Sequence, residues 1–400
     1  MSLRPPRGFL FSACAAGIKA SGKPDLALAI APEGAAAAAM FTRNQVVAAP
    51  VTVGRENLRH CQGQLRALIV NAGNANCATG KQGLKAAKSV CAGLAKQLAA
   101  RQIQAREYQV FPSSTGIIGV PLPLEKIHAA LPDLIAAAAE GEQAFDEFAH
   151  AILTTDTHKK VATQSVVYGG VEAVLAGVGK GAGMIHPNMA TMLVYLFTDL
   201  AATPRELQQC LEEAVDQSFN NVSIDGDTST NDTVLLMASG KSGVEVKAVR
   251  NQFQAAVTKV CRSLAAQIIA DGEGVKHVVR LRIEQARNRT EARKVAAAIA
   301  NSPLVKTAWA GADPNWGRIL AAIGNSGVPI NQDRINIHLG EQQICRHGAA
   351  ILFDHDRAHR YMSEPVYDIR INLGTGSADL EFLSCDLTAE YVHINADYST

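Results

Sequence analysis

Residues 180–193 read KGAGMIHPNMATML, and this stretch decides how the chain is interpreted. Glycines and a proline interrupt its first part, which favours a loop. Ala190 and Thr191 follow, and the apolar run that continues to residue 197 predicts a buried strand. A strained loop of this kind can present the Ala190 carbonyl to the Thr191 hydroxyl for attack. We therefore predict that the chain cleaves itself between residues 190 and 191.

Cleavage at this bond would make Thr191 the N-terminus of a second chain. An N-terminal threonine carries a free α-amine, which can act as general base for its own hydroxyl nucleophile. We expect the two chains, residues 1–190 and 191–400, to stay in one fold because Thr191 begins a core strand. The structural alternative is a threonine that only opens a buried strand, since β-branched residues favour strands.

Composition and charge restrict the class of protein. The 400 residues can bury a large core, and 48% hydrophobic with 19% charged residues is typical of a globular enzyme. The net charge of +1 implies neither nucleic acid nor an anionic membrane as a partner. No run of eighteen or more apolar residues occurs, so we expect no membrane span.

The eight cysteines lie far apart and form no C-x-x-C pair. This spacing argues against a disulfide framework or a zinc site. Buried thiols in a reducing cytoplasm are the simplest interpretation.

The pattern of apolar residues predicts strands alternating with helices in layered α and β structure. The predicted strands cover residues 26–31, 66–70, 161–178, 191–198, 233–238, 276–284, 366–373 and 378–384. The predicted helices cover residues 81–100, 122–139, 203–219 and 247–269. The helix at 203–219 has the clearest start, because Thr203 and Glu206 form a capping box around Pro204.

Short segments spread over nearly the whole chain resemble, in the same order, those of the ornithine acetyltransferase (glutamate N-acetyltransferase) family of bifunctional arginine biosynthesis proteins. They are KGAGMIHPNMATML at 180–193, AAGIK at 15–19, AAPV at 48–51, NAGNAN at 71–76, SSTGIIG at 113–119, TTDT at 154–157, DGDTSTND at 225–232, GADPNWGRI at 311–319 and YVHINADYST at 391–400. Ordered motifs of this number are far more specific than any one of them.

The resemblance implies an α/β (α+β) fold, a layered αββα sandwich similar to the N-terminal nucleophile hydrolases though differently connected. It implies self-cleavage into an alpha chain, 1–190, and a beta chain, 191–400, and a heterotetramer with two copies of each. The implied activity is acetyl transfer from N2-acetyl-L-ornithine to L-glutamate through an acetyl-Thr191 intermediate. No metal or bound cofactor is implied. Acetyl-CoA is a further candidate co-substrate, and we expect a cytoplasmic enzyme.

The resemblance also assigns roles to single residues. Thr191 is the nucleophile, and the hydroxyl of Thr115 with the backbone N–H of Gly116 would form the oxyanion hole. The substrate contacts fall on Thr154, Lys180, Thr191, Glu273, Asn395 and Thr400. Structural alternatives exist for each: SSTGIIG can be a turn, a lone Lys or Glu is usually solvated, and C-terminal residues usually fray. DGDTSTND is interpreted as a polar wall near the site.

Two rival functions stay open from the sequence. A self-processing aminopeptidase or amide hydrolase would let water reach the acyl-enzyme. A non-enzymatic small-molecule binding protein would keep the 190–191 bond intact. A P-loop in GVGKGAG at 177–183 is excluded, because no Ser or Thr follows Lys180 and Pro187 prevents the helix that such a loop requires.

Overall fold

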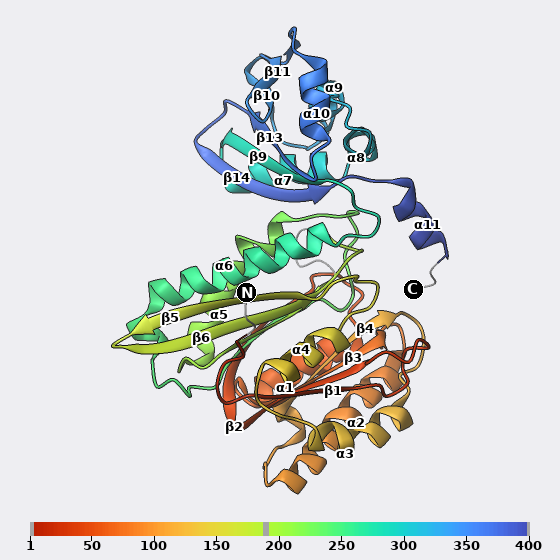
Figure 1. Cartoon of the computed structure of the whole chain (residues 1–400), viewed down its shortest axis with the longest axis vertical. Helices are drawn as coiled ribbons and strands as arrows, with labels where there is room; N and C mark the ends of the chain where they lie inside the picture. Colours follow the sequence, from red (N-terminus) through yellow and green to blue (C-terminus); the bar gives the residue numbers. More distant parts are fainter. Residues whose placement is uncertain (1–3, 187–191, 398–400) are drawn as a thin grey trace.

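Two hydrogen-bonded sheets organise residues 4–186 and 192–397, which are the residues that the computed structural model describes (Figure 1). The eight-stranded sheet has the order β4-β3-β2-β8-β7-β6-β5, with β1 paired to β2. Its strands are β1 (Leu10–Cys14), β2 (Leu26–Phe41), β3 (Gln64–Asn74), β4 (Val110–Ile117), β5 (Lys160–Tyr168), β6 (Val171–Lys180), β7 (Leu193–Thr198) and β8 (Thr233–Ala238).

The second sheet has six strands in the order β12-β11-β10-β13-β9-β14. They are β9 (Val278–Ala286), β10 (Asn336–Leu339), β11 (Gln342–Arg346), β12 (Ala349–Ala350), β13 (Val366–Asn372) and β14 (Ala378–Cys385). The helices are α1 (Ala49–His60), α2 (Gly80–Leu98), α3 (Leu124–Ala136), α4 (Glu142–Ala151), α5 (Pro204–Asp216), α6 (Arg250–Ala270), α7 (Arg289–Ala300), α8 (Pro303–Ala310), α9 (Trp316–Gly324), α10 (His355–Met362) and α11 (Ala389–Asp397).

The long strand β2 folds the larger sheet into a sandwich. Its first part, Leu26 to Ile30, pairs with β1 and β3, and its second part, Ala36 to Phe41, pairs with β8. The register shifts between Ile30 and Ala35. One buried cluster then joins side chains from both halves, and the rings of Phe11 in β1 and Phe197 in β7 lie 5.1 Å apart.

Helices cover the two outer faces of this sandwich. The outer side chains of β2 and β3, such as Leu28 and Ile69, pack against α2 and α3. The outer side chains of β7 and β8, such as Val194 and Leu236, pack against α5 and α6. Four layers of αββα type result, as the family resemblance implied. The two β layers are one hydrogen-bonded sheet that continues through β2.

The prediction of a single strand over 161–178 is wrong. Gly169 and Gly170, at φ +58° and +79°, turn the chain between β5 and β6, which pair antiparallel. Two adjacent glycines take positive φ at little steric cost, so they mark a hairpin. The prediction for 233–238 matches β8, and that for 203–219 matches α5 with both bonds of its capping box.

The smaller sheet and helices α7–α10 form a separate C-terminal lobe, residues 278–385, with its own core. Figure 1 shows it at the upper end of the molecule, with α11 returning toward the sandwich. The two connecting segments are tied together, since His277 Nδ1 and Asp386 Oδ2 are 2.9 Å apart. The sequence did not predict this lobe as a separate unit.

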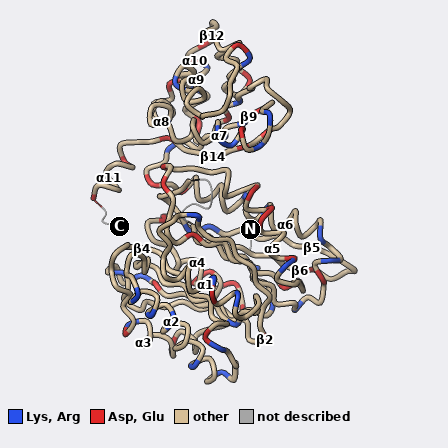
Figure 2. Tube along the Cα trace, turned by 180° about the vertical axis from the view of Figure 1, so that it is seen from behind, with Lys and Arg blue, Asp and Glu red and all other residues tan. Residues whose placement is uncertain are grey.

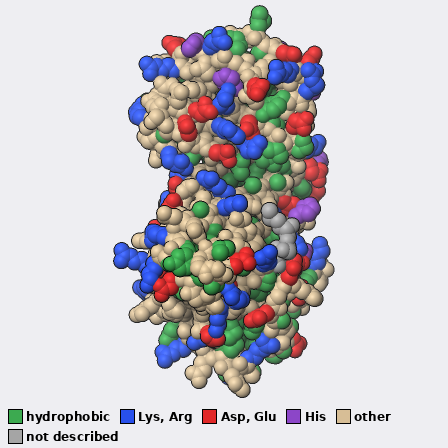
Figure 3. Space-filling view, turned by 60° about the vertical axis from the view of Figure 1, so that its left-hand side comes forward, with side chains coloured by type: hydrophobic (Ala, Val, Ile, Leu, Met, Phe, Trp, Pro, Cys, Tyr) green, Lys and Arg blue, Asp and Glu red, His purple; other side chains and the backbone are tan. Residues whose placement is uncertain are grey.

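Charges of both signs are spread over the described surface. Lys and Arg alternate with Asp and Glu along the trace and on the face seen in space-filling view (Figures 2 and 3). None of the described helices is long and apolar enough to cross a membrane. All eight cysteines are unpaired, and all but Cys14 are buried, as predicted.

Candidate active site

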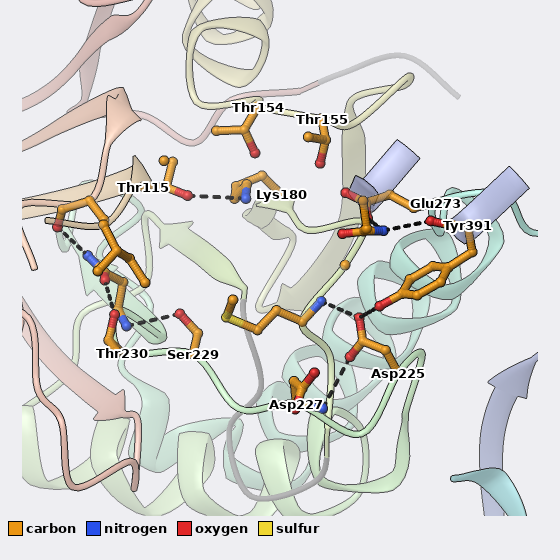
Figure 4. A pocket seen from close by; sticks show the side chains of 17 residues that line it. Thr115, Thr154, Thr155, Lys180, Asp225, Asp227, Ser229, Thr230, Glu273 and Tyr391 are labelled. Atoms are coloured by element: carbon orange, nitrogen blue, oxygen red, sulfur yellow. Dashed lines mark hydrogen bonds between the residues drawn. The ribbon is translucent and has the colours of Figure 1, made fainter. Parts of the chain in front are cut away.

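A polar cavity of about 150 Å³ lies at the end of β4 and β6, beside the loop at 225–231 and α11 (Figure 4). Its walls include every described residue that the sequence assigned to the site: Thr115, Gly116, Thr154, Lys180, Glu273 and Asn395. The remaining assigned residues, Ala190, Thr191 and Thr400, lie outside the described residues. Six positions that are far apart in sequence therefore meet in one place.

Thr115 and Gly116 belong to β4, so residues 113–117 of the SSTGIIG segment are strand, and its last two residues lie in the bend that follows. The side chain of Thr115 is buried, and its Oγ1 accepts a hydrogen bond of 3.2 Å from Lys180 Nζ. Because the lysine occupies an acceptor position, the hydroxyl proton of Thr115 is free to point elsewhere.

Gly116 is required by close packing. Its φ is +131°, and a Cβ there would lie 2.3 Å from the carbonyl carbon of Gly73. The β3–β4 register is irregular at this point, since Asn74 pairs with both Thr115 and Ile117. The neighbouring Ser113 accepts a hydrogen bond from Tyr195 across the sandwich, which indicates a structural role.

Lys180 is a buried cation rather than the solvated one that a lone lysine usually is. It is the last residue of β6 and lies opposite Leu193 of β7. Burial lowers the pKa of Lys180, Asp156 opposes this shift, and Lys160 reinforces it. The side chain thus holds its proton less tightly than an exposed lysine would.

Asp156, in the TTDT segment, anchors the chain around Lys180. Its carboxylate accepts the backbone N–H groups of Gly181 at 2.6 Å and Thr154 at 3.1 Å, and it pairs with Lys160 at 2.5 Å. Burial alone would raise its pKa, but Lys180, Lys160 and the Gly181 N–H lower the pKa of Asp156 to about 2. TTDT is one of the segments that resemble the family, but the resemblance assigns no role to Asp156.

Glu273 and Asn395 form a second polar group on the opposite wall. Asn395 Nδ2 donates to Glu273 Oε2 at 2.9 Å, and the Glu273 N–H donates to the Ala182 carbonyl at 2.8 Å. A Cβ on Gly183 would lie 2.6 Å from Glu273 Oε2, so this glycine allows the carboxylate to approach the loop after β6. The C-terminal helix thus contributes directly to the cavity.

The segment at 225–231 is a polar wall of the cavity, as predicted. Asp225 accepts hydrogen bonds from the backbone N–H groups of Met184 and Ile185, at 2.5 and 2.9 Å. Tyr391 of α11 donates to Asp225 at 3.2 Å, and Figure 4 shows this contact facing the cavity. The sequence analysis assigns no role to Tyr391. Its position as the first residue of the YVHINADYST motif is the one sequence feature that points to it.

The cavity can bind a small polar molecule and support acyl chemistry. It combines a hydroxyl, a backbone glycine, a buried lysine and a carboxylate. Among residues 4–186 and 192–397, no group of three or more His, Cys, Asp or Glu side chains is arranged to hold a metal ion.

Residues 10–400 match the sequence model of the ArgJ family. The chain belongs to the ArgJ family. Similar proteins include the arginine biosynthesis bifunctional protein ArgJ of Methylococcus capsulatus, which is 44% identical over 404 residues and covers 100% of this chain and 97% of its own length. The ArgJ of Thermus thermophilus is 44% identical over 403 residues and covers 100% of both chains.

A solved ArgJ structure, from Bacillus halodurans, is also similar. It has 39% sequence identity and a TM-score of 0.50, and it covers 51% of this chain and 98% of that chain. Membership in the ArgJ family confirms the family predicted from the sequence, and with it an enzyme of arginine biosynthesis.

Proposed function

We propose that the chain cleaves itself between Ala190 and Thr191 and then transfers the acetyl group of N2-acetyl-L-ornithine to L-glutamate through an acetyl-Thr191 intermediate. One observation carries the proposal. The six described residues that the sequence assigned to this reaction, spread between positions 115 and 395, line a single polar cavity. Family membership over residues 10–400 is consistent with this chemistry.

Two further findings support cleavage into two chains that stay together. Strand pairs β6–β7 and β2–β8 join residues from either side of the 190–191 bond, so the sheet would hold both products. The B. halodurans chain matches 51% of this chain with 98% of its own length, as one of two such products would.

In the proposed cleavage, the Thr191 hydroxyl oxygen attacks the Ala190 carbonyl carbon and its proton passes to the departing amide nitrogen. This step breaks the C–N bond and frees the Thr191 α-amine, leaving Ala190 joined to the Thr191 oxygen as an ester. Water then hydrolyses the ester, which releases the Ala190 carboxylate and restores the Thr191 hydroxyl. In acetyl transfer this amine takes the hydroxyl proton and returns it to the leaving amine of ornithine. The α-amine of glutamate then attacks the acetyl carbon, the ester C–O bond breaks, and N-acetylglutamate leaves while the glutamate proton returns to the Thr191 hydroxyl. The Thr115 hydroxyl and Gly116 N–H would donate to the oxyanion in each step.

Substrate recognition would rest on the charged walls of the cavity. The Glu273 carboxylate suits the side-chain ammonium of ornithine, while Lys180 can attract a carboxylate. Thr154, Asn395 and Thr400 would add neutral hydrogen bonds. We further propose that no cofactor stays bound, that acetyl-CoA is a second acetyl donor, and that two copies of each chain form a cytoplasmic heterotetramer.

The cleavage is tested by intact-mass analysis of the purified protein. We expect two species near half of 42.3 kDa from the natural sequence and one full-length chain from Thr191→Ala. Thr191→Ser is the matched control, because it keeps a hydroxyl nucleophile. A single uncut chain with full transferase activity would contradict the proposal.

The transfer is tested with N2-acetyl-L-ornithine in the presence and absence of glutamate. Glutamate-dependent release of ornithine supports acetyl transfer. Equal release without glutamate would identify an amide hydrolase instead.

A further inference from the structure

Asp232 lies beside the first described residue after the proposed cleavage bond. Strands β7 and β8 run parallel with Leu193 opposite Thr233, so Met192 and Asp232 each precede a strand by one residue. Asp232 Oδ1 accepts the Met192 N–H at 3.1 Å, and the Thr233 N–H donates to the Met192 carbonyl at 3.1 Å. Both main-chain polar groups of Met192 are therefore fixed.

The carboxyl group of Asp232 is buried, and only one of its two oxygens accepts a hydrogen bond among the described residues. The residue is 1% exposed, and its Oδ2 has no hydrogen-bond partner among the described residues. Burial raises the pKa of Asp232 well above 3.8, and the Met192 N–H, together with Ser229, Lys180 and Thr42, offsets this shift only in part. The Thr42 hydroxyl instead donates to the Ser229 carbonyl. A buried polar atom without a partner calls for an explanation beyond packing.

We propose that Asp232 is a positioning residue for self-cleavage, which orients the 190–191 peptide bond by holding the main chain of Met192. The proposal rests on the cleavage proposed above. Attack within a chain requires the hydroxyl oxygen and the carbonyl carbon to be about 3–3.5 Å apart. A hydrogen bond to the residue after Thr191 restricts the direction from which that hydroxyl approaches.

Asp199 offers a matched control at the other end of β7. It is also buried, and its Oδ1 accepts the Val174 N–H at 2.8 Å, while Oδ2 pairs with Arg7. Replacing either aspartate by alanine removes a buried acceptor of a main-chain N–H next to the same strand. Only Asp232 binds the main chain of Met192, the residue that follows Thr191 in the sequence.

The experiment follows cleavage of freshly synthesised full-length chains over time by intact mass, together with the thermal midpoint of each variant. We expect Asp232→Ala to slow cleavage by about 100-fold, the loss typical of a misplaced reacting group. Asp232→Asn keeps a neutral oxygen acceptor for the Met192 N–H, so it should cleave at a rate close to the natural sequence. Asp199→Ala should lower the thermal midpoint without slowing cleavage.

Three results would overturn the proposal while leaving the proposed function intact. They are rapid cleavage of a folded Asp232→Ala chain, an Asp232→Asn chain as slow as the alanine variant, and equal slowing by Asp199→Ala. An uncut chain of the natural sequence would overturn both proposals.

Discussion

Asp156 keeps its charge in a buried position because lysines and a backbone N–H group surround it. Burial alone would raise its pKa, but Lys180, Lys160 and the backbone N–H of Gly181 lower the pKa from 3.8 to about 2. A carboxyl whose pKa is lower in the folded state stabilises the fold above its unfolded pKa, and this contribution disappears as the pH falls toward the folded value.

Asp156→Asn should therefore destabilise the protein most clearly at neutral pH. We expect a loss on the order of 2 kcal/mol at pH 7, which narrows as the pH falls from about 4 toward 2. Urea unfolding at several pH values measures it. Asp146→Asn is the control, since the ion pair of Asp146 with Lys159 is partly exposed and should contribute little. A loss that is independent of pH would contradict the assignment.

Thr115→Ala should slow acetyl transfer while the protein keeps its fold. Loss of one oxyanion donor typically costs about 2.7–4 kcal/mol of barrier, or about 10²- to 10³-fold in kcat. Steady-state kinetics with acetylornithine and glutamate measures the change. Thr115→Ser keeps the hydroxyl and should retain most of the rate, and an unchanged kcat in the alanine variant would remove Thr115 from the mechanism.

The sequence motifs predicted residues that line the cavity, but they did not predict the contacts that hold the cavity walls in place. Thr115 and Lys180 lie in short segments that resemble family motifs, and the same resemblance assigns a substrate contact to Glu273. The contact between Asp225 and Tyr391 joins residues 166 apart, and no local pattern predicts such a pairing. The burial of Lys180 likewise depends on the tertiary packing around β6.

At the scale of single elements, α5 is fixed at its start by a complete capping box. Thr203 Oγ1 accepts the Glu206 N–H, and the Glu206 carboxylate accepts the Thr203 N–H. Thr203→Ala should lower the stability by about 1 kcal/mol, the usual cost of a lost N-cap. Thermal unfolding measures it, with Thr203→Ser as a control that keeps the cap. Equal midpoints for the alanine variant and the natural sequence would contradict this reading of the helix start.

Elements with a distinctive local signal were predicted, and those that depend on context were not. The apolar run of β8 and the capping box of α5 gave correct positions. The second half of β2 was missed because it is rich in alanine, which has low strand propensity. Its strand form comes from pairing with β8 and from close packing between layers, which small side chains permit.

At the scale of the whole molecule, cleavage should leave one assembly. Since β7 pairs with β6 and β8 pairs with β2, the two products share a continuous sheet. We expect them to migrate together in size-exclusion chromatography and to separate only under denaturing conditions. Light scattering should give the mass of two copies of the 42.3-kDa chain. Products that separate without denaturant would contradict the shared sheet, and a mass equal to one chain would contradict the proposed heterotetramer.

The way the C-terminal lobe is attached links its orientation to substrate fit. Both segments that enter and leave the lobe border the cavity, one carrying Glu273 and the other leading into α11 with Asn395. On the cavity side both segments are also tied to the sandwich, because the Glu273 N–H donates to the Ala182 carbonyl and Tyr391 of α11 donates to Asp225. A rotation of residues 278–385 would therefore have to break these hydrogen bonds before it could move Glu273 or Asn395 away from Thr115 and Lys180.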